Sequence, residues 1–116
     1  MEISEKEPKS LKVGDAAPDF ELPDASGRRV HLSALLQNKV VVLFFYPKDG
    51  TPVCSAEACS FRDAYQEFVE AGAEVVGISS DTVESHERFS ARHRLSFVLL
   101  SDENGAVRKL YGVMIR

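Results

Sequence analysis

The stretch Val40-Val41-Val42-Leu43-Phe44-Phe45-Tyr46 decides the fold, and it runs directly into Pro47-Lys48-Asp49-Gly50-Thr51-Pro52-Val53-Cys54. A continuous β-branched and aromatic run of this length, without alternation, predicts a strand buried on both faces, as in α/β sheets. The strand stops at Pro47, and the next three residues predict a loop. Thr51 then offers an N-cap oxygen, and Pro52 suits the first position of a helix. Open α/β sheets bind ligands at this kind of strand–loop–helix junction.

Strands and helices alternate in the rest of the chain. Apolar residues from Phe61 to Val69 recur at helical spacing, and Gly72 stands where a helix would end. Further elements are expected along the chain: a strand over 74–79, a helix that opens at the capping-box-like stretch 81–84 and runs to about 93, a strand over 97–100, and a helix capped by Asp102. This alternation predicts a parallel α/β sheet.

The segment before the decisive stretch predicts a β-hairpin. Two short strands, over 19–22 and 28–32, flank a turn-forming cluster at 23–27. Ser33 suits the cap of one helical turn that extends to Leu36. Residues 1–10 are charged and lack periodicity, which predicts a mobile arm. We expect residues 11–116 to form a single domain, the number that 116 residues normally make.

Composition excludes several classes of function. The net charge of −4 disfavours a nucleic-acid-binding protein, which usually needs a basic domain. The longest apolar run is shorter than the roughly 20 residues needed to span a bilayer, so no membrane association is expected. The N-terminus lacks the apolar region of a signal peptide. Two cysteines without such a signal argue against a disulfide-stapled secreted domain and favour a cytoplasmic location.

Cys54 is the leading candidate for a catalytic residue. If Thr51 caps the helix, Cys54 is its third residue and lies beside unpaired N–H groups and the positive end of the helix dipole. Both features favour the thiolate, which is the reactive nucleophile. The Thr51 hydroxyl and the N–H groups of the first turn would also hold a polar substrate. The alternative is that Cys54 is a small, buried, apolar side chain.

Cys59 follows five residues later. In an ideal helix this spacing separates the two Cα atoms by about 8.6 Å. Disulfides rarely exceed about 6.8 Å between Cα atoms, so the pair closes only if the first turns of the helix unwind. A transient, catalytic disulfide fits this spacing better than a structural one, and a reactive thiol beside a resolving thiol is typical of redox-active cysteines.

The remaining polar residues give weaker signals. His86 and His93 lie about 10.5 Å apart along a helix, too far to share one ion, so we expect no metal site and solvated or interface histidines. Glu57, one turn beyond Cys54, either has a role at the site, in which it orients the loop or relays a proton, or is a solvated first-turn carboxylate. We interpret Arg88, Arg92 and Arg94, which share a helix end, as a charged, solvated face rather than a binding patch.

The residues around Cys54 resemble those of a peroxiredoxin. Pro47-x-x-x-Thr51-x-x-Cys54 matches the PxxxTxxC motif of that family in full, and a second cysteine five residues later is similar to the peroxiredoxin Q, or bacterioferritin comigratory protein (BCP), branch. Further stretches support the resemblance, which runs from about Leu11 to Val113: 14–20, 45–49, 59–63, 76–79 and 100–103.

The resemblance implies a thioredoxin-like fold and a peroxidase that reduces hydrogen peroxide and alkyl hydroperoxides. Thioredoxin or a similar dithiol would be the reductant, and no metal, flavin or haem would be needed. Cys54 would be the peroxidatic cysteine, Cys59 the resolving one, Thr51 would orient the peroxide and Pro47 would shield the pocket. The family normally continues beyond Val113 with two strands, a helix and an active-site arginine, and this sequence stops at Arg116.

Two consequences follow from that comparison. Without the additional strands, the strand at 40–46 becomes an apolar sheet edge, so we expect a homodimer or larger assembly that covers it. Two other functions stay open beside the peroxidase. One is a catalytically impaired fragment that self-associates or binds another chain, and the other is a thiol redox sensor.

Overall fold

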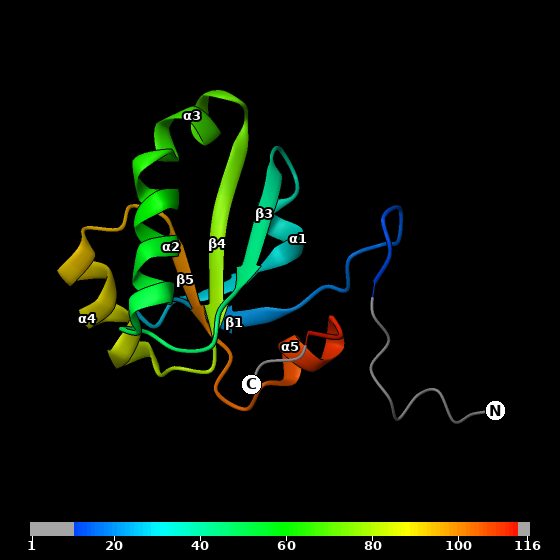
Figure 1. The fold of residues 1–116 in the computed structure, drawn as a ribbon. Coiled ribbons are helices and arrows are strands. Elements are labelled where there is room, and N and C mark those ends of the chain that lie inside the picture. The colour runs from blue at the N-terminus through cyan, green and yellow to red at the C-terminus, as the bar shows by residue number, and fades with distance from the viewer. Residues whose placement is uncertain (1–10, 114–116) are drawn as a thin grey trace.

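The computed structural model describes residues 11–113, and the predicted mobile arm at 1–10 lies outside this range. The chain forms five strands and five helices in these residues (Figure 1), in the order β1 (Glu21–Pro23), β2 (Arg29–His31), α1 (Leu32–Leu35), β3 (Val40–Phe45), α2 (Pro52–Asp63), α3 (Tyr65–Glu70), β4 (Ala73–Ser79), α4 (Val83–His93), β5 (Val98–Ser101) and α5 (Ala106–Leu110).

A three-stranded parallel sheet of order β3-β4-β5 forms the centre of the molecule. β4 lies between the other two strands, which explains why five consecutive residues, from Val75 to Ser79, are buried. The antiparallel hairpin β1–β2 confirms the predicted turn at 23–27, and a single bridge between Asp24 and Leu100 places it beside β5. The predicted parallel α/β architecture is therefore confirmed.

Side chains of the sheet alternate between two apolar clusters, as the two-residue period of a strand requires. On one face, Val75 and Leu99 pack with residues of α2 and α4. On the other face, Val76 and Ile78 pack with residues of the hairpin, α1 and α5. Figure 1 shows α2 and α4 on one side of the sheet and α1 on the other. The strand–loop–helix junction after β3 thus lies at the carboxyl edge of a sheet covered on both faces.

The contact between α2 and the sheet depends on one glycine. The ring of Phe44 stacks on Phe61 of α2, with centroids 4.5 Å apart, and lies over Gly77 of β4. A Cβ atom on Gly77 would lie 2.8 Å from the Phe44 ring and 3.0 Å from Leu99. The absence of a side chain at residue 77 lets the aromatic pair pack closely on the sheet, which holds the end of α2 against it.

One prediction about β3 is wrong. The apolar run predicted a strand buried on both faces, but residues 41–45 are only half-buried and Val40 is 66% exposed. The reason is that β3 pairs with β4 alone and is an edge strand among the described residues. The predicted sheet edge is present there. Tyr46, expected at the end of the strand, lies just beyond it and is buried.

Several predicted caps differ in detail. α1 begins at Leu32 after His31, so Ser33 lies inside the helix rather than capping it. The helix expected to reach Gly72 is interrupted at Ala64, which divides it into α2 and α3. Thr82 caps α4 through the backbone N–H of Ser85, in place of the expected Asp81–Glu84 pair.

Asp102 caps α5 from a distance. Gly105 occupies the N-cap position, and the Asp102 carboxylate accepts hydrogen bonds from the backbone N–H groups of Val107 and Arg108, at 3.1 and 2.9 Å. The predicted capping role is therefore confirmed, although Asp102 stands three residues before the cap. None of the helices in residues 11–113 combines the length and the apolar character needed to cross a membrane.

Candidate active site

The N-terminus of α2 confirms the predicted cap. Thr51 has extended backbone angles, Pro52 is the first helical residue, and the Thr51 hydroxyl accepts a hydrogen bond from the backbone N–H of Cys54 at 3.3 Å. Cys54 is the third residue of the helix, where free N–H groups and the helix dipole stabilise negative charge. Its side chain is free and only 4% exposed. Pro47, at the start of the loop, is exposed.

Asp49 holds the loop that leads to Cys54. Its carboxylate accepts hydrogen bonds from the hydroxyls of Tyr46 and Ser85, at 2.6 and 2.8 Å, and lies 2.8 Å from Nδ1 of His86. Its backbone N–H donates to the carboxylate of Asp81 at 2.7 Å. Burial opposes ionisation of Asp49, but hydrogen bonds from His86, Tyr46 and Ser85 together hold its pKa below the ordinary value. The loop is therefore fixed to α4 and to the segment after β4.

His86 is the central residue of this network, and its predicted exposure is wrong. The side chain is fully buried, and Nε2 lies 2.9 Å from the carbonyl oxygen of Leu100. The ring therefore lies between two hydrogen-bond acceptors, the Leu100 carbonyl and the Asp49 carboxylate. His86 thus links the Asp49 carboxylate to the backbone of β5 in the interior. Burial and the bond to Asp49 raise the pKa of Tyr46, which keeps its phenol protonated as a donor.

Asp49, Asp81 and His86 also have the donor types of a metal site, and one ligand atom of each lies within 4.8 Å of the others. The sequence predicts no metal. Hydrogen bonds already engage these groups. Both His86 nitrogens have partners, and Asp81 accepts from the Ser79 hydroxyl at 2.6 Å and from the Asp49 backbone. The donor set as it stands is satisfied by the protein itself and serves to position the loop.

Cys59 lies on the same intact helix as Cys54, and its thiol is also free. It is half-buried, and its Sγ lies 3.7 Å from Nδ1 of His93, the last residue of α4. Sequence reasoning missed this neighbour, although His86, Phe89 and His93 recur at spacings of three and four residues and so share one helix face. That face is the one α4 turns toward α2 and the sheet.

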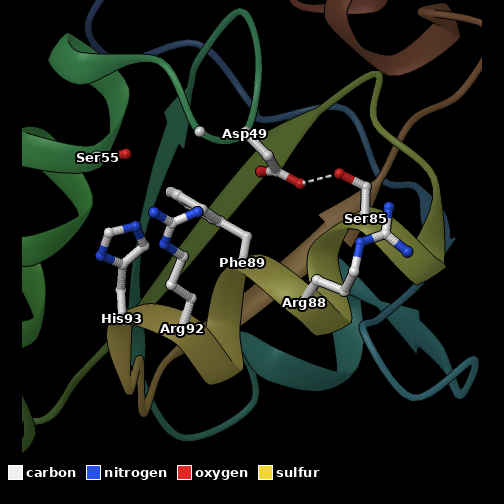
Figure 2. A pocket seen from close by; sticks show the side chains of 8 residues that line it. Asp49, Ser55, Ser85, Arg88, Phe89, Arg92 and His93 are labelled. Carbon is white, nitrogen blue, oxygen red and sulfur yellow. Dashed lines mark hydrogen bonds between the residues drawn. The ribbon is translucent and has the colours of Figure 1, made fainter.

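A hollow of about 320 Å³ opens between the beginning of α2 and α4 (Figure 2). Asp49, Ser55, Ser85, Arg88, Arg92 and His93 are among the residues that line it. The two arginines, interpreted as a solvated face, therefore border a concave site beside the cysteine-bearing helix. Glu57 is exposed in the second turn of α2, so it is not the predicted first-turn carboxylate.

Comparison with known proteins gives consistent matches. The family model described as AhpC/TSA family matches residues 13–116. Peroxiredoxin Q from Sedum lineare is 53% identical over 100 residues, which cover 86% of this chain and 53% of the relative. Peroxiredoxin Q from Arabidopsis thaliana is 52% identical over 103 residues, covering 89% and 47%. The chain spans about half the length of these curated relatives.

Solved structures agree with the sequence matches. The crystal structure of peroxidoxin BcpB from Mycobacterium tuberculosis superposes with a TM-score of 0.88 at 47% identity, covering 91% of this chain and 69% of the other. A mutant form of peroxiredoxin Q from Xanthomonas campestris gives a TM-score of 0.79 at 36% identity, covering 83% and 60%. At these identities the likeness extends to sequence as well as to backbone.

Proposed function

This chain belongs to the AhpC/TSA family and has the thioredoxin-like fold of the peroxiredoxins, and on that premise we propose that it is a thiol-dependent peroxidase. Its substrates would be hydrogen peroxide and organic hydroperoxides. Cys54 would attack the peroxide, Cys59 would resolve the product, and thioredoxin or a similar dithiol would return both cysteines to thiols. Names of relatives and the local geometry of α2 support this proposal.

The observation that carries the proposal is the position of Cys54 as third residue of α2, bonded through its N–H to the Thr51 hydroxyl. A thiolate at this position attacks one peroxide oxygen, an S–O bond forms and the O–O bond breaks. The other oxygen takes a proton and leaves as water or an alcohol. Cys54 is then a sulfenic acid.

Resolution uses the second thiol of the same helix. The sulfur of Cys59 attacks the sulfenic sulfur of Cys54, an S–S bond forms, and the sulfenic oxygen leaves as water. Because both cysteines lie on an intact helix and Cys59 is the fifth residue after Cys54, α2 has to open before the sulfurs meet. A dithiol then reduces the disulfide by exchange, which completes the cycle.

Two serine variants test the assignment, because the chain has only two cysteines. Cys54→Ser is expected to abolish peroxide consumption in an assay coupled to thioredoxin and its reductase. Cys59→Ser is expected to consume about one equivalent of peroxide and to stop at a sulfenic acid that dimedone traps. Peroxide turnover by Cys54→Ser would refute the assignment.

The same assay on the unaltered chain separates the other two functions. Oxidation of Cys54 without turnover would indicate a redox sensor. No reaction with peroxide would mean that Cys54 is the small, buried side chain its 4% exposure also permits, and would favour a chain that acts by binding a partner.

A further inference from the structure

The side chain of His93 lies where a base for Cys59 would be needed. Its Nδ1 is 3.7 Å from the Cys59 sulfur, within reach of a hydrogen bond to sulfur. Two contacts hold the backbone and the ring of His93 in this place. The Arg62 guanidinium donates to the backbone carbonyl of His93 at 2.8 Å, and the Phe89 ring packs edge-on against the imidazole with centroids 4.9 Å apart. The contact between Cys59 and His93, called the pairing below, therefore joins the end of α4 to α2.

We propose that His93 is the proton acceptor that converts Cys59 to a thiolate for the resolving step, an inference that rests on the proposed peroxidase function. A thiolate attacks a sulfenic sulfur and a thiol does not, so the Cys59 proton has to leave. It passes from Sγ to Nδ1 of His93. The thiolate then attacks the Cys54 sulfenic sulfur, the S–S bond forms, and the sulfenic oxygen departs with a proton as water.

Charged side chains lie around His93 and Cys59 on both helices. Arg62 belongs to the same helix as Cys59, and the hydrogen bond that its guanidinium donates to Asp63 is the largest cause of its raised pKa, with attraction to Cys59 a smaller one. From α4, Arg88 and Arg92 line the same hollow as His93, and Asp49 lines it from the loop. Figure 2 shows Arg92 beside His93. Arg62 on α2 and Arg92 on α4 thus place positive charge beside His93.

The pairing also fits the sequence of events that the two cysteines require. Cys59 contacts His93 while α2 is folded, before the helix opens. Proton loss in the folded state prepares the nucleophile, and opening of the helix then delivers it to Cys54. A half-buried His93 that borders a hollow can return the proton to water after each cycle.

The test uses Cys54→Ser, in which Cys59 is the single thiol, and measures its alkylation by iodoacetamide from pH 5 to 10. Adding His93→Gln is expected to shift the rate–pH profile upward by about one unit, which is about tenfold slower alkylation at pH 7. His31→Gln is the matched control, because His31 lies on β2 with its side chain about half exposed. Superimposable profiles for His93→Gln and its parent would overturn the proposal.

A second measurement leaves His93 in place. Cys59→Ser is expected to change the pH titration of the His93 ring protons by NMR and to leave that of His31 unchanged. An unchanged His93 titration would overturn the pairing even if His93→Gln does not fold. Neither measurement needs peroxide, so a chain that shows both effects but consumes no peroxide would refute the peroxidase function and support the pairing.

The resolving step itself provides the kinetic readout. In stopped-flow mixing with one equivalent of peroxide, His93→Gln is expected to form the Cys54–Cys59 disulfide about tenfold more slowly than the parent chain near pH 7, with the gap closing near pH 9, where an unaided thiol ionises. A rate of disulfide formation that His93→Gln lowers equally at every pH would indicate a purely structural role and would overturn the proposal.

Discussion

The Thr51 hydroxyl caps α2 by accepting a hydrogen bond from the backbone N–H of Cys54, the residue proposed to attack peroxide. Thr51→Val keeps the shape of the side chain and removes the oxygen. We expect it to lower the free energy of unfolding by about 1 kcal/mol, the usual value of an N-cap, as measured by urea denaturation. Thr51→Ser retains the oxygen and is expected to stay close to the parent. Equal stability of Thr51→Val and the parent would show that the cap contributes nothing.

The Asp49 carboxylate makes stability depend on acid. Its pKa is lowered in the fold, so the folded state prefers the ionised form more strongly than the unfolded chain does. This contribution is fully present above the ordinary carboxyl value of 3.8 and is lost as the pH falls through the lower folded pKa. We expect Asp49→Asn to reduce stability at pH 7 and to flatten its decline between about pH 5 and pH 2.

Glu57→Gln is the control for this measurement, because Glu57 is exposed on α2 and has no part in the Asp49 network. Urea denaturation at several pH values would compare the two variants with the parent. A decline of the same steepness in Asp49→Asn and the parent would contradict the role given to Asp49.

The roles of the residues from Thr51 to Cys54 could be predicted from the sequence, whereas the burial of His86 could not. Thr51, Pro52 and Cys54 follow one another within a turn, so their roles at a helix start depend on neighbours that the sequence itself displays. The burial of His86 depends on Asp49, 37 residues away, and on the Leu100 carbonyl. No local sequence pattern predicts partners so far away. The spacing of His86 and Phe89 indicates only that both side chains lie on the same face of the helix.

At the scale of elements, we expect oxidation of the two cysteines to unwind part of α2. α2 runs unbroken from Pro52 to Asp63 and carries both free thiols. If a Cys54–Cys59 disulfide forms, its geometry requires the first turns to unwind. We expect peroxide to raise amide hydrogen exchange over residues 51–61 and to lower far-UV helical signal, and dithiothreitol to reverse both.

Helix α4 provides the internal reference for that experiment, because its exchange should change little. Cys59→Ser, which has no partner for the disulfide, is the matched variant and should keep its protection after oxidation. Unchanged exchange over 51–61 in a chain whose Cys54–Cys59 disulfide is proven by mass spectrometry would contradict the unwinding.

Which segments are helices and which are strands could be predicted, because the spacing of apolar residues reflects which side chains are buried. Where each element ends depends on tertiary packing, which the spacing does not show. The break at Ala64 was missed because Phe61 and Phe68, on either side of it, both pack against the same cluster, so the apolar period runs through the interruption. The exposure of β3 was missed for a related reason. An apolar run shows that a strand can be buried, but its place in the sheet decides whether it is.

For the molecule as a whole, the open side of β3 is the feature with the largest consequence. In residues 11–113, β3 pairs only with β4, while the hairpin reaches β5 at the other side of the sheet. An uncharged strand with one open edge is a template for pairing with another chain. We therefore expect the 116-residue chain to form dimers or larger assemblies at micromolar concentration, measured by sedimentation velocity.

Val40→Lys tests the surface involved, since Val40 is 66% exposed on this strand and a lysine there disfavours edge pairing. We expect the variant to sediment as a smaller species than the parent. Val69→Lys, at an exposed position on α3, is the control and should leave the assembly intact. A parent chain that sediments as a monomer and unfolds cooperatively would refute the expectation.

The bond from the Tyr111 hydroxyl to the Pro18 carbonyl, 2.6 Å long, joins positions 93 residues apart. The Tyr111 ring also lies edge-on to Phe20, so the two ends of the described chain meet over one face of the sheet. Closing so long a loop costs more chain entropy than any contact between neighbouring elements. During synthesis the sheet and its first helices can therefore assemble early, while the cover on this face waits for the last elements to emerge. A nascent chain halted before residue 111 would therefore lack the edge-on contact of Tyr111 with Phe20 and the bond to Pro18.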